Sequence, residues 1–148
     1  MTLLPQRVPR SLHPAGWWLW ALGLATAATR TTNPMLLALI IAVAACVVAA
    51  RRDEAPWALG FRLYLWLGAV IVLARVVFRI IFGGGQGSHV LFTLPHVPLP
   101  EWAAGIRLLG PVTAEQILGG AYDGLRLGTM VICLGAANAL ANPKRLLK

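Results

Sequence analysis

The sequence is poor in charged residues, and poorest in acidic ones. Only 12% of the 148 residues are charged, and Asp and Glu together number five, whereas a soluble globular domain typically carries about 25% charged residues. Hydrophobic residues make up 58% of the chain, and the mean hydropathy is +0.72. This shortage of charge argues against a water-soluble domain and favours a chain whose apolar segments lie in a lipid bilayer.

The charges that are present are mostly basic, with thirteen Lys and Arg residues and a formal net charge of +8. In a soluble protein such an excess would indicate nucleic-acid binding. In an apolar chain the same excess is typical of loops that face the cytoplasm and anionic lipid. We therefore expect the lipid bilayer as a partner and no nucleic acid.

Cysteine is also scarce, and catalytic motifs are lacking. Cys46 and Cys133 each lie inside an apolar run, which predicts neither a disulfide framework nor a metal site. The chain contains no Walker A sequence, zincin motif, nucleophile elbow or GxGxxG. His89, His96 and Glu101 lie in one proline-rich stretch, at spacings that are not typical of zinc sites. We expect a non-catalytic protein, without a cofactor or a metal.

Long apolar segments, by contrast, are abundant. They predict an all-α fold, an integral membrane helical bundle of about four transmembrane helices, as a single membrane domain over residues 1–148. The predicted helices cover residues 16–29, 35–50, 61–82 and 113–140, with an extracytoplasmic loop at 83–112. The first two would be about 21 Å and 24 Å long, short of the roughly 30 Å hydrocarbon core. They form either a tightly packed hairpin or two full spans.

The first apolar run also has an alternative interpretation. Arg7 and Arg10 precede it, and small residues follow near Ala25, which is the pattern of a cleaved signal peptide. The three later runs predict membrane insertion whichever interpretation holds.

Short polar motifs mark the ends of the predicted helices. Asn33 and Pro34 predict the start of the second helix, since the residue before a proline avoids helical geometry and proline suits the first helical turn. Thr113, three residues before Gln116, predicts a capping box at the start of the last helix. Asn142 and Pro143 predict where that helix ends.

The loop at 83–112 contains four prolines, which exclude a continuous helix. Val90 to Thr93 can pair as a short strand. Trp102 is expected to anchor the loop at the bilayer surface, because tryptophan is enriched at membrane interfaces.

Five charged residues are expected to lie within the membrane: Arg62, Arg75, Arg79, Asp123 and Arg126. The two arginines near the end of the third helix are expected to snorkel outward or to pair, since a bare arginine within the bilayer is costly. The acid is expected to pair with the arginine three residues later on the same helix, which would neutralise both.

Three glycines recur at four-residue spacing in the last helix: Gly120, Gly124 and Gly128. This spacing leaves one helix face without side chains, so that another helix can approach closely. We predict a packing face here, for a helix of this chain or of a partner.

The distribution of basic residues predicts that both termini are cytoplasmic. With four crossings, seven basic residues lie inside and two outside. The inner ones are Arg7, Arg10, Arg51, Arg52, Lys144, Arg145 and Lys148, and the outer ones are Arg30 and Arg107.

Three segments, in this order, resemble a known family: "RSLHPAGWWLWAL", "RTTNPMLLAL" and "GLRLGTMVICLGAANALANPKRLLK". They are similar to the proline-containing start of the first helix, the Asn-Pro start of the second, and the helix with a proline-marked end in the transmembrane T component of energy-coupling factor (ECF) transporters, the CbiQ/EcfT family. The resemblance covers roughly Ser11 to Leu147.

The resemblance implies a subunit of an ABC-type transporter complex in the bacterial inner membrane, for uptake of a vitamin or a transition-metal ion such as cobalt. In this family, two ABC-type ATPases hydrolyse ATP, a separate S component binds the substrate, and the T component couples them without a site of its own. Family members continue past the proline step into cytoplasmic coupling helices. We therefore expect this chain to be a fragment that cannot couple alone.

Two other functions remain open at this point. One is a small membrane scaffold or regulatory subunit that binds partners through the face of Gly120, Gly124 and Gly128. The other is a proton- or metal-coupled carrier that uses Asp123 and the histidines of the outer loop.

Overall fold

The structure is a computed structural model that describes residues 13–51, 58–83, 87–95, 97, 100 and 108–141. This part is 78% helical and contains four helices, which confirms the prediction of a mostly helical chain. The elements are α1 (Pro14–Arg30), α2 (Pro34–Ala50), α3 (Ala58–Phe82), β1 (Val90–Thr93), β2 (Pro111–Thr113) and α4 (Ala114–Leu140). Predictions for the following residues lie outside the described part: Arg7, Arg10, Arg52, His96, Glu101, Trp102, Arg107, Asn142, Pro143, Lys144, Arg145 and Lys148.

Proline and a capping side chain open each of the first two helices. His13 caps α1, where its Nδ1 accepts a hydrogen bond from an amide two residues later at 3.2 Å, and Pro14 follows it. Asn33 and Pro34 do the same for α2, with Asn33 Oδ1 accepting at 2.9 Å. Proline has no N–H to leave unpaired at this position, and the cap satisfies one of the free amides.

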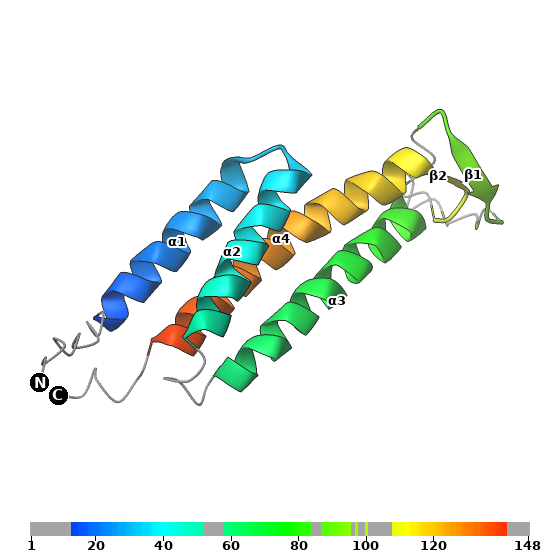
Figure 1. Cartoon of the computed structure of the whole chain (residues 1–148). Helices are drawn as coiled ribbons and strands as arrows, with labels where there is room; N and C mark the ends of the chain where they lie inside the picture. Colours follow the sequence, from blue (N-terminus) through cyan, green and yellow to red (C-terminus); the bar gives the residue numbers. More distant parts are fainter. Residues whose placement is uncertain are drawn as a thin grey trace, which may run out of the picture.

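A capping box opens α4, as predicted. The backbone N–H of Gln116 donates to Thr113 Oγ1 at 3.4 Å, and the backbone N–H of Thr113 donates to Gln116 Oε1 at 3.3 Å. The predicted strand from Val90 to Thr93 is also confirmed, as β1, which pairs antiparallel with β2. The two strands form a small sheet, called here the cap, at the ends of α3 and α4 (Figure 1).

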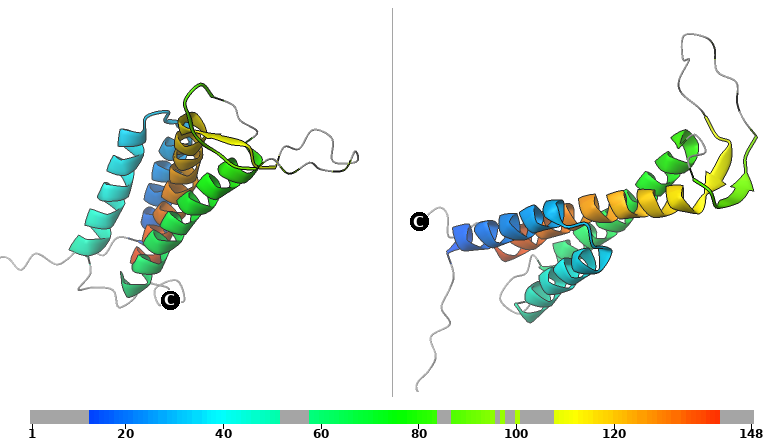
Figure 2. Two further views of the ribbon diagram at one scale, coloured as in Figure 1. Left: turned by 90° about the vertical axis from the view of Figure 1, so that its right-hand side faces the viewer. Right: turned by 90° about the horizontal axis from the view of Figure 1, so that it is seen from above.

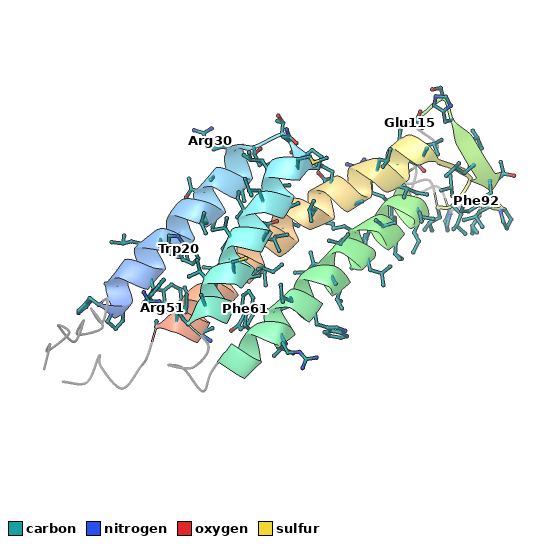
Figure 3. All side chains as sticks on the ribbon, viewed as in Figure 1. Trp20, Arg30, Arg51, Phe61, Phe92 and Glu115 are labelled. Carbon is teal, nitrogen blue, oxygen red and sulfur yellow. The ribbon has the colours of Figure 1, made fainter. Side chains whose placement is uncertain are left out.

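α4 is the central helix, and it packs against α1, α2 and α3. α1 and α3 run in one direction and α2 and α4 in the other, so that the start of α1 and the end of α4 lie at one end of the bundle and the cap at the other (Figure 1). α2 and α3 touch mainly near the end of α2, where Phe61 packs with Ala44 and Val48 (Figure 3). From there the two helices diverge toward the cap.

The helices differ in length by pairs. α1 and α2 have 17 residues each, while α3 has 25 and α4 has 27. At 1.5 Å per residue these are about 25 Å, 38 Å and 40 Å. Tyr122 Oη in the third turn of α4 donates to the Thr31 carbonyl at 2.8 Å. The α1–α2 turn therefore lies beside the third turn of α4, and the first two turns of α4 extend past the α1–α2 turn toward the cap.

Two of the described helices are long and apolar enough to cross a membrane: Gly60–Phe82 of α3 and Ala114–Leu140 of α4. The shorter α2 is apolar as well. In the apolar stretch of 18 residues that qualifies each helix, only 6% of the residues of α3 and 33% of those of α4 are buried. A core helix of a soluble protein would be mostly buried. Large apolar side chains on α3 face outward, Leu63, Trp66, Leu73 and Phe78 among them. This is the surface that a lipid-facing helix presents.

Small residues form much of the core between α4 and the first two helices. One cluster joins Ala44 and Val48 to Ile132, Ala136 and Ala139. A second cluster, around Cys133, contains Ala28, Leu37 and Ile40. At the end of the α1–α2 hairpin opposite its turn, the Arg51 guanidinium lies 5.5 Å from the centre of the Trp17 ring. This cation–π contact joins the start of α1 to the end of α2.

Candidate functional site

The predicted glycine face of α4 lies against α3. A Cβ atom added to Gly124 would lie 2.6 Å from the Cα of Val72, and one added to Gly120 would lie 3.0 Å from the Cα of Val76. At Gly128 the nearest atom is the Gly68 carbonyl oxygen, at 3.0 Å. These neighbours are backbone atoms, which cannot swing aside. The α3–α4 seam is therefore a backbone-to-backbone contact that only glycine permits.

Two further glycines of this seam were not predicted from the sequence. Gly68 of α3 faces Gly128 and would meet Ile132 Cδ1 at 2.9 Å if it carried a Cβ. A Cβ on Gly135 would overlap the ring of Tyr64. Gly135 follows Gly128 by seven residues, which is two helical turns on the same face. The signal was therefore present, but at a spacing of seven rather than four.

An ion pair between helices crosses this seam. Arg79 Nη2 lies 2.9 Å from Asp123 Oδ2, and the two side chains are 49% and 42% exposed. The arginine crosses α4 beside Gly120, where its Cγ would lie 3.0 Å from an added Cβ. Because Gly120 has no side chain, the Arg79 side chain can pass over α4 at this point and reach Asp123.

This pairing corrects the predicted pair of Asp123 with Arg126. Successive residues of a helix are rotated by about 100°, so Arg126 lies about 200° around α4 from Gly124, away from α3. Asp123, one residue before Gly124, stays within reach of Arg79. Arg126 Nε is buried and has no hydrogen-bond partner among the described residues.

A second polar bridge joins the same two helices near their other end. Asn138 Nδ2 donates to Tyr64 Oη at 3.2 Å. Asn138 is fifteen residues beyond Asp123, or about 22 Å along α4. The two bridges therefore join α3 and α4 on either side of the contacts of Gly124, Gly128 and Gly135.

The two remaining predicted charges, Arg62 and Arg75, are exposed on α3. Neither has an ion pair or a hydrogen bond within the part of the chain that the structure describes. Arg62 lies near the start of the helix. Arg75 lies well inside it, one turn before Arg79, and its Cβ is 3.2 Å from a Cβ built on Gly124.

The cap is attached to the start of α4 through Glu115. The Glu115 carboxylate accepts hydrogen bonds from the Ser88 amide at 3.3 Å, the Ser88 hydroxyl at 3.2 Å and the His89 amide at 3.3 Å. The Ala114 amide donates in turn to the His89 carbonyl at 3.0 Å. A carboxylate in the first turn also suits the positive end of the helix dipole. These bonds hold the cap to α4, and Figure 3 shows Glu115 at the junction between them.

Gln116 shows where the cap end is incompletely paired. Its side chain is only 4% exposed, and its Nε2 has no hydrogen-bond partner among the described residues. A Cβ on Gly83, at the end of α3, would lie 2.9 Å from this nitrogen. An unpaired buried donor typically costs about 1–3 kcal/mol, so this junction contributes less stability than the seam below it.

The chemistry gathered at the seam is structural. It consists of close backbone contacts, one ion pair and one hydrogen bond between side chains. Within the described residues, no three or more His, Cys, Asp or Glu side chains lie close enough to hold a metal ion. The arrangement can fix two helices and carry polar contacts to a neighbour.

Comparison with known proteins adds no relative. No protein-family model matches the chain, and no curated protein and no solved structure matches it. The functional proposal therefore rests on the sequence pattern and on the geometry above.

Proposed function

We propose that this chain is the membrane part of a coupling subunit, similar to the T component of an ECF transporter. In this role it catalyses no reaction. It passes the movement of two ABC-type ATPases to a separate S component, which binds a vitamin or a transition-metal ion such as cobalt. The protein would lie in the bacterial inner membrane as a multi-pass bundle.

The observation that carries this proposal is the central position of α4. The helix that the resemblance places before the cytoplasmic region is the one that contacts all three others. A displacement applied at its far end is passed to the whole bundle, because close-packed interiors transmit strain. The glycine contacts and the two polar bridges make α3 and α4 a stiff pair, which is what a coupling element needs.

The exposed apolar surface of α3 supports the membrane location. The orientation with both termini inside is supported by the count of seven inner and two outer basic residues. In Figure 3, Arg30 lies at the end of α1 that points toward the cap, and Arg51 lies at the opposite end of the α1–α2 hairpin. The cap would then face away from the cytoplasm.

The two alternatives have less support. A scaffold that binds partners through Gly120, Gly124 and Gly128 would need this face free, and α3 covers it. A carrier would need Asp123 and the outer histidines in one place. Asp123 is paired with Arg79, and His89 lies just before β1, where its backbone amide donates to Glu115 in the first turn of α4, two turns before Asp123.

The test is co-purification with the S components and ATPases of ECF transporters from the organism that encodes the chain. We expect the chain to retain an S component in detergent. Failure to retain any S component would contradict the proposed function.

A further inference from the structure

The α3–α4 pair has one side that α1 and α2 leave uncovered. α1 and α2 pack on α4 through residues such as Leu125, Ile132 and Cys133. About 180° from Leu125 around α4 lies a row formed by Asp123, Leu134 and Asn138, at offsets of eleven and fifteen residues. We call this side the open face, and it consists of Arg75, Phe78 and Phe82 of α3 together with Asp123, Leu134 and Asn138 of α4.

The open face carries exposed aromatic side chains and one arginine, Arg75, whose positive charge is not balanced by an acid of the described residues. Phe78 and Phe82 are 63% and 49% exposed, and their rings stack at 5.3 Å. The nearby part of the seam contains Arg75, Arg79 and one acid, Asp123, and this acid forms its ion pair with Arg79. Arg75 is exposed, and no acceptor among the described residues pairs with it.

Depth and direction decide what can pair with Arg75. In a helix the Cα–Cβ bond tilts toward the N-terminus. Arg62 lies near the N-terminal end of α3, so its side chain leaves the backbone toward the nearer bilayer surface and snorkels easily. Arg75 lies about 10 Å inside the C-terminal end, and its side chain starts back toward the middle of the helix. A lipid phosphate beyond the cap end is in the wrong direction for it.

We infer that the open face docks a membrane-spanning helix of a partner protein that carries one Asp or Glu at the depth of Arg75. The carboxylate pairs with Arg75, and the apolar residues of the partner pack on Phe78, Phe82 and Leu134. Within the described residues a second copy supplies no free acid, because Asp123 is paired with Arg79 and Glu115 accepts hydrogen bonds from Ser88 and His89. Two copies facing each other would double the positive surplus. The inference requires that the bundle lies in a bilayer, and it does not require the transporter assignment.

The experiment uses the full chain in phosphatidylcholine vesicles and a Leu-rich probe peptide of about 23 residues, long enough to span. The peptide carries a single Asp about seven residues from one end, or Asn in the matched version. Energy transfer between labels on the chain and the peptide reports association. We expect the Asp peptide to bind about tenfold more tightly than the Asn peptide, in line with polar contacts between membrane helices. Arg75→Gln should abolish this preference, and Arg75→Lys should keep most of it.

Arg62→Gln is the matched control, since it removes an arginine of the same helix that can reach the surface, and it should leave the preference unchanged. Equal binding of the two peptides to the native chain would overturn the inference without any variant. A preference that survives Arg75→Gln would also overturn it. So would loss of binding when phosphatidylglycerol replaces phosphatidylcholine, since a lipid headgroup would then be the ligand. Self-association of the chain that depends on Arg75 would identify a second copy as the occupant and exclude the proposed one.

Discussion

The two helix pairs of this bundle are held together in different ways. α3 and α4 meet along a line of glycines and are bridged by Arg79–Asp123 and Tyr64–Asn138. α1 and α2 make few contacts with each other beyond their turn and the contact of Arg51 with Trp17, and each leans on α4 (Figure 2). The molecule is thus a closely packed pair of helices, α3 and α4, with the α1–α2 hairpin attached to α4. Stability and specificity are therefore expected to reside mainly in the α3–α4 seam.

The largest difference expected between the two pairs concerns whether each crosses the bilayer. In a background with Cys46 and Cys133 replaced by alanine, Ser88→Cys in the cap and Thr32→Cys in the α1–α2 turn should both react with an impermeant maleimide from outside. A reporter that is active only outside the inner membrane should give no signal when fused after Lys148. Reaction at Ser88→Cys with protection at Thr32→Cys would mean that the hairpin stops within the bilayer, contrary to the prediction of four spans.

The next largest effect is expected at the glycines of the seam. Gly124→Leu should lower the free energy of unfolding by about 3 kcal/mol or more, because its first side-chain atom would strike the backbone of Val72. In detergent this corresponds to a melting temperature lower by about 10 °C. Gly23→Leu in α1 is the control, since a Cβ there meets nothing within 4 Å. Equal melting temperatures for the two variants would show that the seam tolerates separation.

A moderate loss of stability is expected when the ion pair of the seam is removed, and a double-mutant cycle measures it. Asp123→Asn should destabilise by about 1–2 kcal/mol, and Arg79→Gln should add little once the acid is gone. The same cycle with Arg126→Gln should show additive effects, because Arg126 does not pair with Asp123 here. Coupling between Asp123 and Arg126 larger than that between Asp123 and Arg79 would restore the pairing that the sequence alone suggests.

The smallest effect compares two tyrosine hydroxyls. Tyr122→Phe removes the bond to Thr31 that ties the hairpin to α4, and should cost about 1 kcal/mol. Tyr64→Phe removes the bond from Asn138 and should cost about 0.5 kcal/mol, because this bridge is exposed and the glycine contacts remain. Hydrogen exchange should quicken in α1 and α2 for Tyr122→Phe alone. Faster exchange in both pairs for either variant would mean that the bundle opens as one unit.

Local features were predictable from the sequence, and contacts between helices were not. The capping box of Thr113 and Gln116 depends on residues three positions apart. The strand at Val90 to Thr93 was predictable from its own composition, although its partner β2 lies far along the chain and was not predicted. Gly68 and Gly128, or Arg79 and Asp123, lie far apart in the chain, and their contact depends on how two helices are rotated about their axes. The predicted pair of Asp123 with Arg126 was wrong for this reason, since a sequence neighbour was preferred to a partner on the facing helix.

The unequal lengths of the two pairs carry a consequence for the surrounding lipid. In a bilayer of about 30 Å, the 25 residues of α3 fit only if the helix tilts by roughly 37° or the lipid beside it thickens. The 17-residue helices of the hairpin require the opposite, a locally thinner bilayer. The bundle would thus be mismatched in opposite senses on its two sides, and the membrane would change thickness around it from α1 and α2 to α3.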